Sequence, residues 1–340
     1  MKIVLDAMGG DHAPEVAVAG AVDAAREFGV TVIMVGQEDV VRQELAKHDA
    51  TGLDLPVVNA TQVVDMHDKP SEVVRGKPDS SMHVGMKLVK DGQADAFVTC
   101  GNTGGALAVA LFQLGRIKGE GQRRIHRPTL ATVFPTRQGV CFFADTGANT
   151  EWKPVYLQQF AVMGSVYAEN VLGIPNPRVG LVSIGEEEGK GNVQVKEAYD
   201  LIKTTPGLNF IGNVEGKDIP AGVADVVITD GFTGNVVLKL AEGVAKLIMD
   251  TMREEITSRT LAKVGALLAR PALQAVGKRL DYAEYGGGVL LGLNHICIIG
   301  HGRSNARAVR SAIKVAMEAV QADVVGKIRV GLAEQPALAD

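Results

Sequence analysis

The sequence alternates between short apolar, β-branched runs and longer amphipathic stretches of helical length. Ten runs predict strands, among them KIVLDA at 2–7, ADAFVTC at 94–100 and HICIIGHG at 295–302. Most are separated by helical patterns such as 14–28 and 304–325. This alternation predicts βαβ units, and therefore a three-layer α/β fold in which a mostly parallel sheet carries helices on both faces.

The composition narrows the class of protein. With 46% hydrophobic and 22% charged residues, the 340-residue chain has ample material for a core. A formal net charge of −4 argues against a nucleic-acid binder driven by bulk charge. No low-complexity linker interrupts the chain, so we expect one continuous domain over 1–330 and a frayed tail over 331–340.

The cysteines and the N-terminus indicate the compartment. Cys100, Cys141 and Cys297 lie in or beside apolar runs without C-x-x-C spacing, which predicts reduced and mostly buried thiols. No secretory signal pattern precedes the first strand, and no apolar run approaches the roughly 18 residues of a spanning helix. We therefore expect a cytoplasmic protein.

Six loops that follow predicted strands share one composition. Each mixes Gly with Asn, Asp, Thr or Ser: DAMGGDHAP, CGNTGGA, DTGANTEWKP, SIGEEEGKGN, TDGFTGN and IGHGRSN. Because the strand-to-helix loops of a parallel sheet emerge at its carboxyl edge, we expect all six to gather at one pole. Backbone N–H groups and helix N-termini at that pole favour an anion. For any single loop, the ordinary preference for these residues in turns and at helix N-caps explains the composition equally well.

The first loop, DAMGGDHAP, allows a metal site, an acid/base pair or an anion cradle. Asp6, Asp11 and His12 have ligand chemistry, but no second cluster with tight ligand spacing supports them, so we expect no metal. Neither a dinucleotide fingerprint nor a P-loop is present. Gly9 and Gly10 then form the close-approach turn of an anion cradle. The aspartates orient the loop, because carboxylates facing phosphate would repel it, and His12 is a candidate donor.

The remaining loops offer polar residues for a phosphate or substrate site, some of which could donate hydrogen bonds to phosphate or to a developing oxyanion. The candidates are Asn102, Thr103, Asp145, Asn149, Lys153, Lys190, Asn192, Asp230, Asn235, His301, Ser304 and Asn305. For Asn102 and Thr103, capping of the helix that begins near 104 explains the letters equally well. His301 suits a general acid, a hydrogen-bond donor or a structural role, and Ser304 is a natural N-cap for the last helix.

Residues 254–280 are unusually basic and amphipathic, within a predicted helical excursion over 236–283. Pro271 should divide the segment into two short helices. Its candidate contact residues are Arg259, Leu261, Lys263, Leu268, Arg270, Leu273, Lys278 and Arg279. Such a stretch can lie on an anionic membrane, meet an acidic partner or pack on a second copy of the chain, and these uses can coexist.

Eight strings, in order along nearly the whole chain, are similar to those of one family. They are LDAMGGDHAP, DSSM, GNTGGA, RVGLVSIGEEEGKGN, FIGNVEGKDI, VADVVITDGFTGNVVLK, DYAEYGGG and HGRSNA. Together they resemble the bacterial phosphate acyltransferase (PlsX) family. Two positions depart from the family's pattern. Glu186 stands where a Thr is expected, and Arg303 stands where a small residue is expected.

The resemblance implies that acyl-ACP and inorganic phosphate are converted to acyl phosphate and ACP without a cofactor. A membrane glycerol-3-phosphate acyltransferase would then use the product in phospholipid synthesis. The resemblance also implies a homodimer at the membrane periphery, and a Rossmann-like fold related to isocitrate and isopropylmalate dehydrogenases and to phosphotransacetylase. For this reaction the candidate catalytic residues are His12, Asn102, Lys190, Asn235 and His301.

This chemistry needs no enzyme nucleophile. Phosphate is already nucleophilic at neutral pH, and the leaving thiol has a pKa of about 8.5. No G-x-S-x-G elbow surrounds a serine and the cysteines lack a polar setting, so we expect no covalent enzyme intermediate. ACP is acidic, and Arg123, Arg124 and Arg127 are candidates for its docking, together with the basic segment.

Three alternatives stay open. A phosphotransacetylase-type enzyme would share the phosphate site but use acyl-CoA, for whose nucleotide the sequence carries no signature. A dehydrogenase of the related fold is weaker, because its acid-rich metal site is not evident. The third alternative, from another class, is a non-catalytic protein that recruits a lipid enzyme to the membrane.

Overall fold

The computed structural model describes residues 1–119, 124–280 and 286–333, apart from the side chains of 278 and 280. All ten predicted strands form, and an eleventh, β10 (Gly288–Leu291), was not predicted because it has four residues flanked by glycines. The predicted ten are β1 (Lys2–Asp6), β2 (Thr31–Gly36), β3 (Val57–Asn59), β4 (Ala96–Thr99), β5 (Thr129–Thr136), β6 (Gly139–Ala144), β7 (Arg178–Val182), β8 (Asn209–Val214), β9 (Val226–Ile228) and β11 (Ile296–Ile299).

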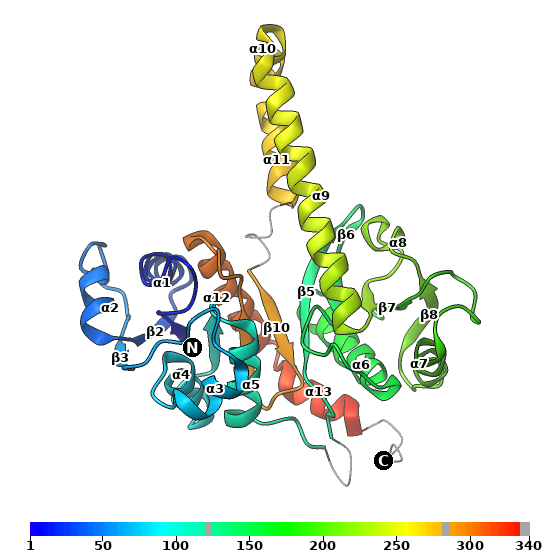
Figure 1. Ribbon diagram of the computed structural model, residues 1–340, viewed down its shortest axis with the longest axis horizontal. Helices are drawn as coiled ribbons and strands as arrows, with labels where there is room; N and C mark the ends of the chain where they lie inside the picture. The colour runs from blue at the N-terminus through cyan, green and yellow to red at the C-terminus, as the bar shows by residue number, and fades with distance from the viewer. Residues whose placement is uncertain (120–123, 281–285, 334–340) are drawn as a thin grey trace.

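Helices connect most of these strands and cover the sheet (Figure 1). They are α1 (Glu15–Phe28), α2 (Glu38–Leu45), α3 (Pro70–Gly76), α4 (Ser81–Lys90), α5 (Thr103–Gln113), α6 (Pro154–Asn170), α7 (Val193–Lys203), α8 (Asp218–Ala221), α9 (Gly231–Ser258), α10 (Thr260–Leu268), α11 (Arg270–Leu280), α12 (Ala306–Gln321) and α13 (Val324–Ala333). The helix predicted over 304–325 is thus two helices. Asp323, with φ of 47°, ends the first of them.

The strands form one sheet in the order β3-β2-β1-β4-β11-β10-β5-β6-β9-β7-β8. Between described residues, seven strand pairings are parallel and three are antiparallel. Strand β10 is antiparallel to both β11 and β5, and β5 is antiparallel to β6. The mostly parallel sheet is therefore confirmed. Its two parallel halves, however, run in opposite directions.

This reversal corrects the prediction that all six glycine-rich loops gather at one pole. The loops after β1, β4 and β11 lie at one edge of the sheet, whereas those after β6, β7 and β9 lie at the opposite edge. The cause is the connection between β5 and β6, which has only two residues, Arg137 and Gln138. A two-residue connection forms a hairpin and cannot hold the crossover that a parallel pair requires.

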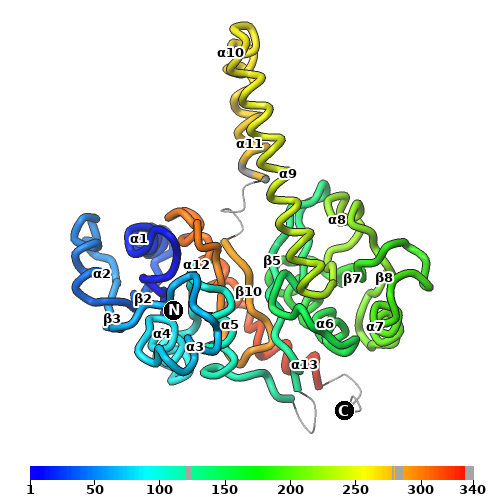
Figure 2. Tube along the Cα trace, in the orientation of Figure 1, coloured from blue at the N-terminus to red at the C-terminus, as the bar shows by residue number. Residues whose placement is uncertain are grey.

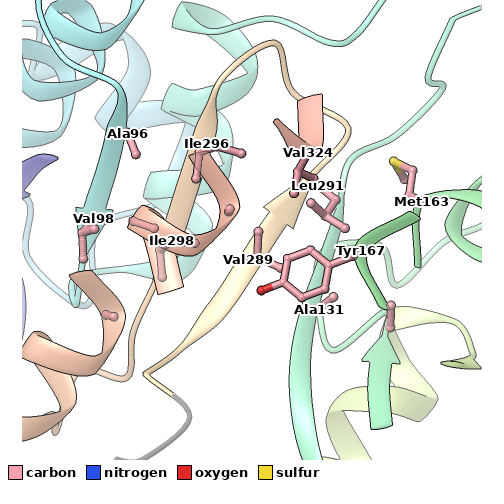
Figure 3. Close-up of a cluster of buried hydrophobic side chains, with 14 of the residues drawn as sticks. Ala96, Val98, Ala131, Met163, Tyr167, Val289, Leu291, Ile296, Ile298 and Val324 are labelled. Carbon is pink, nitrogen blue, oxygen red and sulfur yellow. The ribbon is translucent and has the colours of Figure 1, made fainter. Parts of the chain in front are cut away.

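One hydrophobic core runs beneath both halves of the sheet. It includes Ala96 and Val98 of β4, Val289 of β10, Ala131 of β5 and Tyr167 of α6 (Figure 3). The opposite face carries two separate clusters, one under α4 and α5 and one under α8 and the root of α9. All three cysteines are free and buried, as predicted.

Three helices project from the body. Helix α9 begins on the sheet and continues far beyond it, α10 forms the tip, and α11 returns beside α9 (Figure 1 and Figure 2). The predicted division at Pro271 is confirmed, since α10 ends at Leu268 and α11 begins at Arg270. Within the described residues, no helix is both long and apolar enough to cross a membrane.

Candidate functional site

Three of the glycine-rich loops meet at the carboxyl ends of β1, β4 and β11. The backbone N–H of Asp11 donates to the carbonyl of Gly302 over 2.7 Å, which joins the first loop to the last. Gly10 has a φ of 111°, and a Cβ there would lie 3.1 Å from the same carbonyl oxygen. A side chain at position 10 would therefore separate the loops, so the sequence needs glycine at this contact.

A small hollow, partly open to solvent, lies between these loops. Gly9, Gly10, His12 and Ser304 line it, together with Cys100. Burial raises the pKa of the Cys100 thiol to about 11, although a hydrogen bond with Ser304 opposes the shift. The thiol is therefore protonated at neutral pH, which fits the prediction that no cysteine acts as a nucleophile.

Asp6 connects two of the loops around the hollow through hydrogen bonds. Its carboxylate is buried, accepting the Thr99 hydroxyl over 2.7 Å and the Met8 backbone N–H over 3.1 Å. The Thr99 oxygen in turn accepts the Gly101 N–H over 3.0 Å, so one chain of hydrogen bonds joins the β1 loop to the β4 loop. Burial raises the pKa of Asp6, while the donated hydrogen bonds lower it. This geometry is consistent with the predicted loop-orienting role of Asp6.

Both polar atoms of the Asn102 side chain form hydrogen bonds within the chain. Its side-chain oxygen accepts the Gly105 N–H over 2.9 Å and caps α5. Its amide nitrogen donates to three backbone carbonyls of the loop before α3, those of Asp65, Met66 and Asp68. The capping role is thus realised, and Asn102 fixes a neighbouring loop. Thr103 is exposed at the first position of α5.

The cap of α12 differs from the prediction. Asn305, rather than Ser304, is the N-cap, and its side-chain oxygen accepts the Ala308 N–H over 2.9 Å. Ser304 is buried beside Cys100 and lines the hollow. The sequence offers two adjacent capping residues, and the position of the turn decides between them.

A second group of loops forms around the ends of β6 and β9. The buried Asp145 carboxylate accepts backbone N–H groups from Gly147, Ala148 and Asn149 at 2.8–3.0 Å. It also accepts the side-chain amide of Asn149 over 2.7 Å. Burial raises the pKa of Asp145, and these hydrogen bonds oppose the rise. Asp145 and Asn149 therefore shape the loop from within.

The root of α9 is packed tightly on this second group. Asp230 caps the helix by accepting the N–H groups of Phe232 and Thr233, each over 3.0 Å. A Cβ on Gly234 would lie 1.8 Å from the Asp145 carbonyl oxygen, so only glycine fits there. Asn235 follows directly, with its side chain beside Gly147.

The other predicted site residues in the loops after β6 and β7 are exposed. Asn192 caps α7 by accepting the Val195 N–H over 2.9 Å. Lys190 lies in the same loop, with its ammonium nitrogen 3.9 Å from the Glu187 carboxylate. Lys153 stands at the start of α6 and makes no side-chain cap.

One face of α9 bridges the two loop groups. Asn235, Lys239 and Glu242 follow at i, i+4 and i+7, so they share a face over roughly 10 Å of helix. Asn235 lies beside the β6 loop. Glu242 contacts the β11 loop, with its oxygens 3.4 Å from the His301 Nε2 and 3.2 Å from an Arg303 nitrogen. The helix therefore brings His301 and Asn235 toward one site.

Sequence reasoning missed Thr99, Lys239 and Glu242. Thr99 lies in an apolar run and has no motif of its own. The spacing of Lys239 and Glu242 from Asn235 was a usable signal, because a helix that begins at the TDGFTGN loop places all three on one face.

Three carboxylates outside these loop groups also come together. Glu186, Glu215 and Asp218 each offer an oxygen within 4.8 Å of the others. The Lys217 ammonium lies 3.4 Å from Glu186 and also pairs with Glu215. One cation of the chain itself thus pairs with two of the three carboxylates, and the expectation of no metal stays a prediction.

The candidate contact residues of the projecting helices differ in exposure. At the tip, Leu261 is 88% exposed and Leu268 is 81% exposed. Lys263 and Arg270 are also exposed, and Leu273 is half-buried.

Two arginines of these helices bond within the chain. Arg259 pairs with Glu255 over 2.8 Å. Arg279 donates to the carbonyls of Thr136 and Arg137, which fastens α11 to the β5–β6 hairpin. Arg124 and Arg127 are exposed, whereas Arg123 and the side chain of Lys278 lie outside the described residues.

Comparison with known proteins identifies relatives of this chain. A family described as "Fatty acid synthesis protein" matches residues 1–327. Relatives named "Phosphate acyltransferase" are 48% identical in Geobacter sulfurreducens and in Desulforudis audaxviator, with 95% and 98% of this chain covered and 92% and 97% of theirs. The chain belongs to the phosphate acyltransferase family. This result confirms the resemblance seen in its sequence motifs.

Solved structures of low sequence identity share the fold of this chain. A phosphotransacetylase from Streptococcus pyogenes aligns with a TM-score of 0.64 at 21% identity, covering 95% of this chain and 94% of that one. A 4-hydroxythreonine-4-phosphate dehydrogenase from Klebsiella pneumoniae aligns with a TM-score of 0.56 at 16% identity, covering 94% and 99%. At these identities the likeness shows the α/β fold alone.

The hydrogen bonds of Thr99 predict a specific defect when this side chain is replaced. Thr99→Val keeps the shape but removes the link between the β1 and β4 loops. We expect the KM for phosphate to rise about 10-fold, as losing a hydrogen bond to a buried charge costs about 1.5–3 kcal/mol. Steady-state kinetics at varied phosphate checks this. Thr129→Val is the matched control, because the buried Thr129 hydroxyl has no hydrogen-bond partner among the described residues. Equal effects of both variants would contradict the role of Thr99.

Proposed function

We propose that this chain transfers the acyl group of acyl-[acyl-carrier-protein] to inorganic phosphate, giving acyl phosphate and free ACP. The product would feed glycerol-3-phosphate acylation in phospholipid synthesis. The observation that carries this proposal is the 48% identity to proteins named "Phosphate acyltransferase" over 95–98% of the chain. The loop groups described above supply a site whose chemistry suits that reaction.

The reaction requires positioning and charge stabilisation more than a protein nucleophile. A phosphate oxygen attacks the thioester carbonyl carbon, the carbon–sulfur bond breaks, and the thiol of ACP leaves. The tight loops after β1, β4 and β11 hold phosphate through backbone N–H groups, with His12 as a donor. Lys190, Asn235 and His301 stabilise the oxyanion that forms in the transition state. Asn102 contributes by holding the adjoining loop in place.

Four further polar residues assist these groups. We assign substrate contacts to Thr103, Lys153 and Ser304, of which Ser304 lines the hollow, and we assign to Asp11 the orientation of the phosphate-binding first loop. The loop-shaping residues are Asp145, Asn149, Asn192, Asp230 and Asn305, since their side chains bond to the backbone of the loops and helix starts. No metal and no cofactor take part in the proposed mechanism.

Acyl-ACP is negatively charged, and we place its docking surface at the exposed Arg124 and Arg127. Both lie in the segment that leads into β5. Charge reversal of the two residues should raise the KM for acyl-ACP about 10-fold and leave the KM for phosphate unchanged. The assay measures hydroxylamine-reactive acyl phosphate formed from long-chain acyl-ACP and phosphate.

The same assay tests the function itself. Turnover of acyl-CoA alone would favour a phosphotransacetylase-type enzyme. No turnover of either donor, with vesicle binding retained, would favour a membrane scaffold. An unchanged KM for acyl-ACP in the reversed variant would move the docking surface elsewhere without affecting the proposed reaction.

We also propose that the protein is a homodimer paired through α9. The polar face of α9 is turned toward its own chain, at Asn235 and Glu242. Its apolar residues are exposed instead, at spacings of three and four: Phe232, Val236, Leu240, Val244, Leu247 and Ile248. An apolar stripe of this length is expected to be covered, and a second copy of the same helix matches it in chemistry and length.

Substitution within the stripe tests the dimer. Val244→Asp with Leu247→Asp should weaken association at least 100-fold, because burying each aliphatic side chain contributes about 1.5–3 kcal/mol. Sedimentation equilibrium measures the mass against the 35.8 kDa chain. Lys246→Asp, on the polar side of α9, is the control and should leave the dimer intact. A monomeric wild-type protein would refute the proposal.

The tip of the projection is proposed to rest on an anionic membrane. Leu261, Val264, Leu267 and Leu268 of α10 are exposed, and Lys263 lies among them. An apolar patch with basic neighbours suits the interface between lipid headgroups and acyl chains. This proposal places the protein on the cytoplasmic face as a peripheral protein, and it suits delivery of an acyl phosphate to a membrane acyltransferase.

Vesicle sedimentation tests the tip. Leu261→Glu with Leu268→Glu should reduce binding to anionic vesicles at least 10-fold, since two exposed leucines lose their insertion. Turnover of soluble acyl-ACP should stay near normal. Val330→Glu is the control, because Val330 is a comparably exposed apolar residue on α13. Equal loss in both variants would indicate a general charge effect and not a tip contact.

At the level of architecture, we propose one catalytic domain over 1–330 that includes the helical excursion over 236–283, with a tail over 331–340. The core beneath both halves of the sheet supports this unit. Residues 281–285 and 334–340 lie outside the described part of the chain. We further assign the fold to the isocitrate and isopropylmalate dehydrogenase type, on the basis of the strand order and the likeness to the 4-hydroxythreonine-4-phosphate dehydrogenase.

A further inference from the structure

We propose that Glu242 is a positioning residue for the acyl transfer, which orients His301 and fastens the β11 loop to helix α9. The role rests on the proposed reaction, in which His301 donates a hydrogen bond to the substrate. Glu242 belongs to none of the six glycine-rich loops. It acts from the fourth turn of a helix whose root lies at the opposite edge of the sheet.

The carboxylate of Glu242 is the centre of a charged cluster. Its oxygens lie 3.1 Å from the Lys239 ammonium, 3.4 Å from His301 Nε2 and 3.2 Å from an Arg303 nitrogen. Its side chain is 15% exposed, compared with 51% for Lys239 and 60% for Arg303. A partly buried carboxylate between three basic side chains fixes their positions, because removing it would leave their charges facing one another.

The contact with Glu242 also determines which ring nitrogens of His301 can donate a hydrogen bond. Nε2 faces Glu242, so a neutral ring keeps its proton on that nitrogen and offers only an acceptor at Nδ1. The imidazolium form donates from both nitrogens. Glu242 favours this charged form, in which the ring can donate from Nδ1 as well as from Nε2.

Several groups act on the charge of His301. Among the described residues, these are Lys239 and Glu242 of α9 and Arg303 of its own loop. Burial lowers the pKa of His301 most, and the charges of Lys239 and Arg303 lower it further. Glu242 raises this pKa, so it opposes the other effects. Removing Glu242 and removing Arg303 should therefore shift the titration in opposite directions.

The experiment compares Glu242→Gln and Arg303→Gln with the wild-type enzyme. Histidine-selective NMR follows the titration of His301, which a His301→Gln spectrum assigns. The pH dependence of acyl phosphate formation is measured in parallel. Activity that needs protonated His301 falls as the pH rises through its pKa. We expect this fall at lower pH in Glu242→Gln and at higher pH in Arg303→Gln, with kcat of Glu242→Gln about 10-fold lower at neutral pH.

Asp250→Asn is the matched control, because it removes another carboxylate from α9, one that pairs with Lys246 away from the loops. The control should change neither the His301 titration nor the pH profile. Unmoved His301 titration in both variants would overturn the proposal. So would shifts in the same direction.

The two measurements separate this proposal from the proposed function. Shifted NMR titrations with an unchanged pH profile would show that Glu242 orients a histidine that the reaction does not use, which refutes the positioning role. A wild-type enzyme without acyl phosphate formation would refute the function, while the NMR titrations would still report on the contact between Glu242 and His301.

Discussion

The reversal of strand direction across β10 and the β5–β6 hairpin is the constraint on which the rest of the structure depends. It divides the glycine-rich loops into two groups at opposite edges of one sheet. Neither group alone holds all the candidate catalytic residues. Helix α9 is the element that connects them, because its root packs tightly on the β6 loop and Glu242 in its fourth turn contacts the β11 loop.

Both loop groups are held by the same physical means. A buried aspartate at the end of a strand, Asp6 or Asp145, accepts several hydrogen bonds from the loop that follows. Each carboxylate is buried and accepts backbone N–H groups of its loop, which orders that backbone. Preorganised N–H groups are what the transition state of a phosphate-driven acyl transfer requires, because they need no rearrangement when charge develops.

The sequence patterns predicted the elements well and their arrangement less well. Strand runs such as 94–100 and 295–302 were recognisable because buried strands have a strong local signature. Strand direction has no such signature, and the two-residue connection at Arg137 and Gln138 was its only local sign. The loop residues were predicted from their glycine-rich setting. Glu242 could not be found in that way, because its importance comes from a contact 59 residues away in the chain.

The length of α9 has a consequence for how the enzyme would work at a surface. One unbroken helix holds Glu242 at the site and ends at Ser258, where the tip begins. The 16 residue steps from Glu242 to Ser258 span roughly 24 Å at about 1.5 Å per residue. With the tip resting on a bilayer, the reacting carbon would stand at a fixed height above the headgroups. A labile acyl phosphate would then cross a short gap to its acceptor, and water would have correspondingly little time to hydrolyse it.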